Sequence, residues 1–381
     1  MRKGLAAAGV VALITAGAAA CGSDEPSTPQ GKVSNAFTKL GEQKSVTLGL
    51  SFDATAQQIY AAMKDEDDFE LADAKMLAGL SVKAGFSSDK PLAELKSKDK
   101  GSSVGLQVLS GASNGKGGKP LAGVRSVGQK VYLQVDLKGI ASLDPDNSEL
   151  SDINDLLASV DSMPSSFASV KALAKGGWVS VDPEAFGEFF KTLGKDDTGS
   201  GDTGSDGSSD DGAGSPLDGL GLPSGLPTGL PTDLADKTLA QLLAPLQQSL
   251  TRDAKLTDLG SHDGADHVKA TIPARTLVKD LEGGLGSLAG QLPGRMSKDL
   301  QDVPDKPVDL DLAIKDGTLS HITLDMAQLD DTVHGKLPLD MSLDGGAAPV
   351  EAPKGAQPLN PQDLVGLVMA QLGGLGGDDD A

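Results

Sequence analysis

Residues 45–52 have the sequence SVTLGLSF, and this short stretch decides the class of fold. Val46, Leu48, Leu50 and Phe52 fall on one face of an extended chain, while serine, threonine and glycine fall on the other. An apolar–polar period of two residues predicts a strand with one buried face and one wet face. Such strands are typical of an antiparallel sheet.

The same period recurs along the chain on both sides of a polar break. Further strands are predicted over 104–108, 131–135, 268–272, 310–314, 322–326 and 337–343. The dipeptides Asp263-Gly264 and Asp316-Gly317 stand between strand-like runs and predict tight hairpin turns. From the number of such runs we expect about nine to eleven strands.

Helical patterns are fewer than strand patterns. Helices are predicted over 34–40, 55–64, 151–174, 182–193, 234–250 and 273–288. Together, the patterns predict an α+β fold, a large curved antiparallel sheet with helices on its concave side.

Composition divides the chain into segments of distinct character. Residues 1–20 form an export signal, 21–33 a flexible stalk, 34–194 and 234–344 two parts of a folded domain, 195–233 an acidic and Gly-Leu-Pro-rich insertion, and 345–381 a polar, glycine-rich tail. The insertion is too polar to bury a core and is predicted to be disordered. Because strand patterns lie on both sides of it, we expect one interrupted sheet and not two independent domains.

The N-terminus predicts export and lipid anchoring. Arg2 and Lys3 precede an uncharged, mostly apolar stretch, and three alanines lead directly into Cys21. This resembles the lipobox of bacterial lipoproteins, whose cysteine is acylated and becomes the first residue of the mature chain. Cys21 is the single cysteine among 381 residues, which favours lipidation over an ordinary secretory signal with an incidental cysteine. We therefore expect a chain tethered by its lipid to the outer face of the cytoplasmic membrane.

Charge and motifs argue against several classes of function. The formal net charge of −21 predicts repulsion of nucleic acid and of anionic headgroups. Residues 111–115 match the G-x-S-x-G pattern of hydrolases, but the following GKGGKP cannot start the helix that this motif needs. His262 and His267 bracket DGAD and could face each other to bind zinc, although a solvated turn is the simpler interpretation. We expect no enzymatic activity, no metal and no cofactor.

Four stretches, over 123–136, 175–183, 264–278 and 312–326, together resemble the LppX/LprG lipoproteins of actinobacteria, relatives of the LolA carrier fold. The resemblance implies an antiparallel half-barrel whose concave face, covered by helices, encloses an apolar cavity for acyl chains. It also implies a lipid or lipoglycan ligand that the protein carries away from the membrane. The chain departs from this family in its 195–233 insertion and in its greater length.

The strand patterns and the resemblance together give the candidate cavity wall. Its members are Leu48, Leu50, Phe52, Leu106, Val108, Leu133, Val135, Leu312, Ile314 and Leu324. The leading hypothesis is a lipid-anchored protein that binds or transfers lipid. The alternative is a structural or interaction lipoprotein with a closed core, no ligand and an acidic surface that meets an unidentified protein partner.

Overall fold

The computed structural model describes residues 28–65, 69–95, 101–111, 117–143, 148–185, 246–277, 279 and 306–362. The predicted export signal, Cys21 and the 195–233 insertion lie outside the described residues. The predicted helices over 182–193, 234–250 and 273–288 are described only in part.

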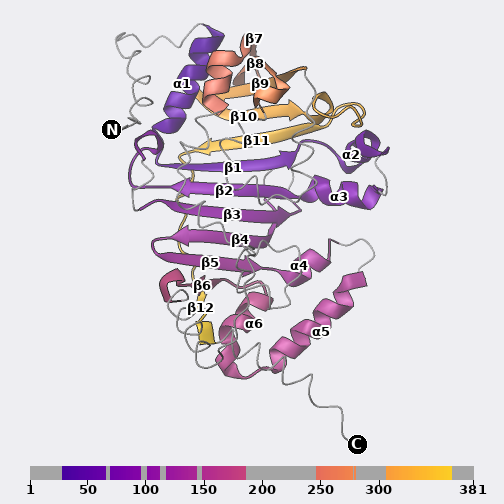
Figure 1. The fold of residues 1–381 in the computed structure, drawn as a ribbon, viewed down its shortest axis with the longest axis vertical. Coiled ribbons are helices and arrows are strands. Elements are labelled where there is room, and N and C mark those ends of the chain that lie inside the picture. The colour runs from indigo at the N-terminus through magenta and orange to yellow at the C-terminus, as the bar shows by residue number, and fades with distance from the viewer. Residues whose placement is uncertain are drawn as a thin grey trace, which may run out of the picture.

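One open sheet holds all the described strands (Figure 1). They are β1 (Ser45–Phe52), β2 (Ser81–Ser87), β3 (Ser103–Ser110), β4 (Lys119–Val127), β5 (Lys130–Val135), β6 (Val179–Val181), β7 (Lys255–His262), β8 (Ala265–Pro273), β9 (Pro307–Lys315), β10 (Thr318–Asp325), β11 (Pro338–Gly345) and β12 (Gln357–Pro358). Their order is β12-β6-β5-β4-β3-β2-β1-β11-β10-β9-β8-β7. The two predicted parts meet where β1 pairs with β11, so the expectation of one interrupted sheet is confirmed.

The sheet is larger than expected and is not wholly antiparallel. The described strands number 12, and β12 pairs with β6 in parallel. The two predicted hairpin turns join β7 to β8 and β9 to β10. Asp263 and Gly264 have φ values of 53° and 79°, and Asp316 and Gly317 have 53° and 73°. Positive φ at both central residues is what a type I′ hairpin turn requires.

The strand register gives the sheet an apolar face and a polar face. Leu48 pairs with Leu343 on β11 and with Ala84 on β2, which pairs in turn with Leu106 on β3. The alternate positions hold polar or small side chains, among them Thr47, Asp344 and Lys83. Because directly opposed residues point to the same side, the two-residue period of each strand adds up to one continuous apolar face.

Helices pack on the apolar face or at the ends of the strands. They are α1 (Pro29–Gly41), α2 (Ala56–Met63), α3 (Leu71–Gly79), α4 (Leu137–Ala141), α5 (Ser148–Ser162) and α6 (Ala168–Ala174), with single 3-10 turns at Leu92–Glu94, Ser165–Phe167 and Met326–Gln328 and a π turn at Ser249–Asp253. The helix predicted over 151–174 is in fact two helices, because Pro164 cannot continue a helix from the preceding residues. Helices α3 and α4 were not predicted.

Helix α1 starts inside the segment predicted to be a stalk. Thr28 caps the helix by accepting a hydrogen bond from the Gly31 amide at 3.1 Å, and Pro29 occupies the first turn. Val33 is fully buried in the main core. The stalk interpretation is therefore wrong for residues 29–33, which belong to the folded domain.

The main core lies between α1 and the apolar face of β8, β9 and β10. Val33, Phe37 and Leu40 of α1 join Leu312 and Leu319 in one buried cluster. The cluster also takes in Leu246 and Leu250, which follow the insertion in sequence. Both parts of the chain thus contribute to the same core.

The segment after β11 crosses the polar face and is not a free tail (Figure 1). The Val350 amide donates to Ser87 Oγ at 2.9 Å, and Arg125 donates to the Glu351 carbonyl oxygen at 3.0 Å. The segment then forms β12 at the edge of the sheet. The prediction of a tail from residue 345 onward is therefore wrong as far as β12.

We predict that Gly123→Ala lowers the stability of this polar face. A Cβ on Gly123 would lie 2.8 Å from Cη2 of Trp178, whose ring also holds the Arg125 guanidinium 4.8 Å from its centroid. Because a rigid indole must then move, we expect a loss of about 1–3 kcal/mol in the free energy of unfolding. Urea unfolding, followed by the fluorescence of the single tryptophan, measures it. Gly79→Ala is the control, since its Cβ would make an ordinary 3.7 Å contact. Equal stability of the two variants would contradict the prediction.

Candidate functional site

All the residues predicted to line a cavity lie on the apolar face. The register places there Leu48, Leu50 and Phe52 of β1, Leu106 and Val108 of β3, Leu133 and Val135 of β5, Leu312 and Ile314 of β9, and Leu324 of β10. They share a face, but they do not share one environment. Their surroundings divide them into residues of closed cores and residues that stay accessible.

Two of the predicted residues belong to the closed core. Leu312 is 0% exposed and Ile314 is 5% exposed, and both are in the cluster that α1 covers. Leu48 and Leu324 are partly buried at the margin of the same cluster. Leu312 and Ile314 are therefore not part of the candidate site, because α1 already occupies the space above them.

Two further predicted residues pack against smaller clusters. Phe52 contacts the cluster of α2 and α3, which contains the fully buried Ile59. Leu133 packs with Val179 of β6 and Leu173 of α6. These clusters close the apolar face beyond the end of β1 and over β5 and β6.

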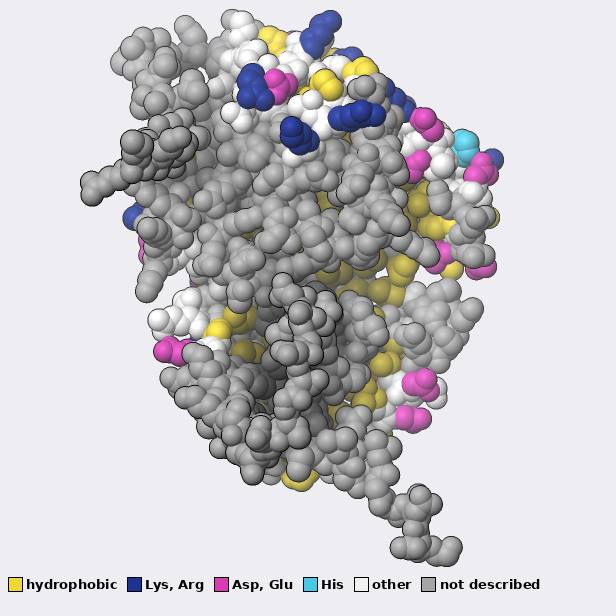
Figure 2. Space-filling model, in the orientation of Figure 1, with side chains coloured by type: hydrophobic (Ala, Val, Ile, Leu, Met, Phe, Trp, Pro, Cys, Tyr) yellow, Lys and Arg dark blue, Asp and Glu magenta, His cyan; other side chains and the backbone are white. Residues whose placement is uncertain are grey.

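Between these clusters lies a region that we call the central patch. It consists of Leu50, Val82, Leu106, Val108, Ala122, Val124 and Val135. None of them belongs to an apolar cluster formed by the described residues. Leu50 and Val82 are 38% and 36% exposed, and the other side chains of the patch are half-buried. Figure 2 shows apolar side chains over the middle strands of this face.

The central patch consists of one straight row across five neighbouring strands and a shorter second row beside it, formed by Leu106 and Val124. Leu50 pairs with Val82, Val82 with Val108, Val108 with Ala122, and Ala122 with Val135. With strands spaced about 4.8 Å apart, this row extends for roughly 20 Å from β1 to β5. Its shape is that of a long apolar strip with no charged side chain among its members.

Sequence reasoning missed Val82 and Val124 because it did not predict β2 and β4. Residues 81–87 do show the two-residue period, in Val82, Ala84 and Phe86. The small Ala84 and Gly85 weaken that signal, and in β4 the apolar positions on this face are only Ala122 and Val124. Counting shorter alternating runs with small residues allowed would have found β2.

The polar face is acidic and internally paired. Asp309 accepts a hydrogen bond from the Thr271 hydroxyl at 2.5 Å and lies 3.2 Å from Lys269 Nζ. The Thr271 hydroxyl and Lys269 hold the pKa of the Asp309 carboxyl below its ordinary value, against the opposing effect of burial. His267 Nδ1 lies 3.0 Å from Asp311. This face thus carries cross-strand pairs of polar and charged side chains, and the lowered pKa of Asp309 keeps that carboxyl ionised.

The two histidines proposed as zinc ligands do face each other across the hairpin. Their rings stack with centroids 3.5 Å apart, and each Nδ1 is near a different aspartate, Asp263 for His262 and Asp311 for His267. Among the described residues, no group of three or more metal-binding side chains converges. The described helices also include none long and apolar enough to cross a membrane. Cys21, and residues 112–115 of the G-x-S-x-G pattern, lie outside the described residues.

The chain matches no family model and no curated protein. Among the solved structures that resemble it are two that share 10% sequence identity with it. LprF from Mycobacterium bovis has a TM-score of 0.34 over 86% of this chain and 97% of its own. The lipoprotein LppX of Mycobacterium tuberculosis has a TM-score of 0.30 over 85% of this chain and 98% of its own. LppX is one of the proteins named in the family resemblance above. At these values the likeness is a loose one of fold and does not make the chain a member of that family.

Proposed function

We propose that this chain is an extracytoplasmic lipoprotein, anchored through acyl chains on Cys21, that binds or transfers lipid by holding acyl chains against the central patch. In this proposal the lipid anchor keeps the protein at the outer face of the cytoplasmic membrane. The bound lipid is a separate molecule, and the protein performs no chemical reaction on it.

The observation that carries the proposal is the uneven closure of one continuous apolar face. Over β8 to β10 the face is sealed by α1, whereas Leu50 and Val82 remain more than a third exposed. A contiguous exposed apolar surface on a soluble domain is typical of a binding site. Each methylene that leaves water there contributes about 0.8 kcal/mol, so a long acyl chain needs no polar contact to bind.

The N-terminal sequence supports the proposed location of the protein at a membrane. Small residues leading into a single cysteine predict attachment to the membrane from which a lipid would be taken. A tethered domain meets membrane lipid at high effective concentration, which favours extraction of a poorly soluble ligand.

Lipid analysis of the purified protein tests the proposal. Residues 22–381 would be secreted behind a signal without a lipobox, so that no acyl chain is attached covalently. We expect lipid to co-purify at about one molecule per protein and to be identified by mass spectrometry after solvent extraction. A protein that purifies free of lipid and takes none from vesicles would favour the alternative, a lipoprotein that binds a protein partner.

A further inference from the structure

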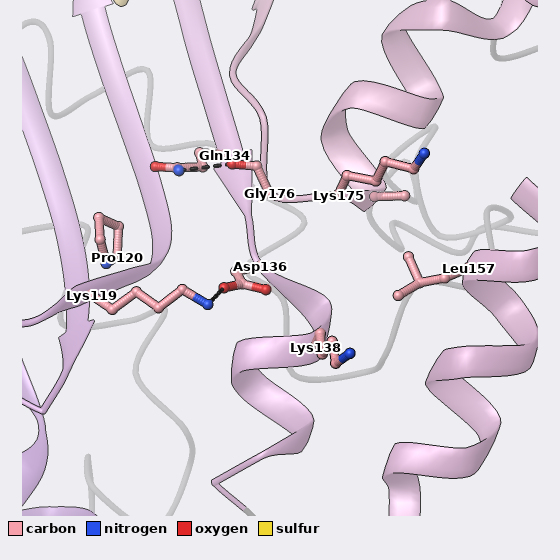
Figure 3. A pocket seen from close by; sticks show the side chains of 9 residues that line it. Lys119, Pro120, Gln134, Asp136, Lys138, Leu157, Lys175 and Gly176 are labelled. Carbon is pink, nitrogen blue, oxygen red and sulfur yellow. Dashed lines mark hydrogen bonds and ion pairs between the residues drawn. The ribbon is translucent and has the colours of Figure 1, made fainter. Parts of the chain in front are cut away.

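A second feature of the molecule is a cavity of about 410 Å³ at the end of β5, between that strand and helices α4, α5 and α6 (Figure 3). Its lining includes Lys119, Lys138, Lys175, Gln134, Asp136 and Leu157. Lys119 comes from the start of β4, Lys138 from α4 and Lys175 from the end of α6. Three elements thus bring three cations to one cavity in a chain whose net charge is −21.

Asp136, the single carboxylate among the described residues of this lining, is already engaged. Asp136 accepts a hydrogen bond from the Gly139 amide at 2.9 Å, and Lys119 Nζ lies 2.5 Å from its other oxygen. Burial would raise the pKa of the Asp136 carboxyl, but Lys119 and the Gly139 amide outweigh it and lower that pKa. Asp136 therefore stays ionised and neutralises Lys119, which leaves the positive charge of the cavity to Lys138 and Lys175.

The ion pair that Lys175 makes outside the cavity is weak. Its Nζ lies 2.5 Å from Asp161, but the side chains are 55% and 53% exposed. Ion pairs this exposed to water contribute little free energy to stability, because solvent and salt screen them. An anion inside the cavity can therefore compete with Asp161 for this ammonium group.

The cavity also holds a buried acceptor that lacks a donor. Gln134 Nε2 donates to the Gly176 carbonyl oxygen at 2.9 Å (Figure 3). The Gln134 Oε1 atom is buried, and none of the described residues donates a hydrogen bond to it. A buried acceptor without a donor costs free energy, so this position favours a ligand with a hydroxyl group.

Strand β5 contributes residues both to this cavity and to the central patch. Val135 lies in the patch, and its two neighbours in the chain, Gln134 and Asp136, line the cavity. Gln134 pairs with Gly123 and so points to the polar face, whereas Val135 points to the apolar face. The cavity and the apolar strip therefore approach each other only at the end of β5, and a ligand that reaches both must pass around that strand end. Leu157 of α5 adds an apolar side chain to the cavity wall.

We infer that this cavity binds a phosphate group that carries a hydroxyl-bearing substituent, as in the headgroup of an anionic phospholipid whose acyl chains lie on the central patch. Lys138 and Lys175 donate to the phosphate oxygens, and Gln134 Oε1 accepts from the hydroxyl. This inference rests on the proposed function. The inference departs from the expectation that an acidic chain repels anionic headgroups, because at physiological salt charges act over only about 8–10 Å.

Lipid uptake from vesicles of defined composition tests the inference. Residues 22–381 would be incubated with vesicles of phosphatidylcholine and phosphatidylglycerol in equal parts, and the bound lipids would be extracted and quantified. We expect a preference for phosphatidylglycerol. We expect Lys138→Gln/Lys175→Gln to reduce that preference about tenfold or more while uptake of phosphatidylcholine is unchanged. Lys130→Gln, an exposed lysine at the other end of β5, is the matched control and should behave as wild type.

The other outcomes separate the cavity from the patch. Equal uptake of the two lipids by the wild-type chain, or equal loss of both by a double variant with an unchanged circular dichroism spectrum, overturns the headgroup assignment. If the wild-type chain takes up neither lipid, the proposed function fails. Titration with glycerol 3-phosphate and with inorganic phosphate then decides the cavity alone. If the wild-type chain binds one of these compounds and the double variant does not, the cavity is a site for a soluble phosphate. If the wild-type chain binds neither compound, the assignment of a phosphate site to the cavity is overturned.

Discussion

Leu312→Asp is expected to unfold the domain. Leu312 is fully buried on β9, with Val268 and Ile322 as its cross-strand partners and with α1 above it. A carboxylate there has no route to water, and the lost leucine leaves unfilled space. We expect a cost of about 4 kcal/mol or more, against a total stability of roughly 5–15 kcal/mol for a typical domain. Urea unfolding followed by circular dichroism measures the change.

Leu50→Asp, on the same apolar face, is expected to leave the domain folded but to remove its bound lipid. The leucine is 38% exposed and belongs to none of the described core clusters, so an aspartate can reach solvent. We expect a stability change of about 1 kcal/mol or less together with loss of bound lipid, since a charge at the patch opposes an acyl chain.

The two variants together separate the carrier from the closed-core alternative. A Leu50→Asp protein that unfolds like the Leu312→Asp protein would show that the patch is core, and would favour the interaction-protein alternative. A Leu50→Asp protein that stays folded and keeps its lipid would place the lipid elsewhere.

Cys21→Ser is expected to release the protein from the membrane or to stall its processing. A diacylated cysteine anchors durably, whereas a serine there cannot receive the lipid. Fractionation of cells into membrane and soluble proteins, followed by mass measurement of the chain, checks the result. Ser23→Ala is the control and should remain membrane-bound. Retention of a processed Cys21→Ser chain in salt-washed membranes would contradict lipid anchoring at this residue.

The sequence by itself determined the strands with a regular two-residue period, among them β1, β9 and β11, and the sides that they present. In β1, β9 and β11 each apolar side chain alternates with a small or polar one. A strand with this pattern buries its apolar side chains on one face and turns the small or polar ones to the other. The same pattern placed all the candidate residues on one face. The hairpins at Asp263-Gly264 and Asp316-Gly317 were determined equally locally, since few residue pairs adopt positive φ twice in succession.

Tertiary structure alone decided what lies on that face. Leu312 and Leu50 occupy equivalent positions in their strand patterns, yet α1 buries one and leaves the other exposed. A two-residue period gives the direction of a side chain but not the partner it meets, because the partner comes from a distant part of the chain. For the same reason the cavity lined by lysines could not be predicted from the sequence. Lys119, Lys138 and Lys175 show no common spacing, and only the packing of β4, α4 and α6 brings them together.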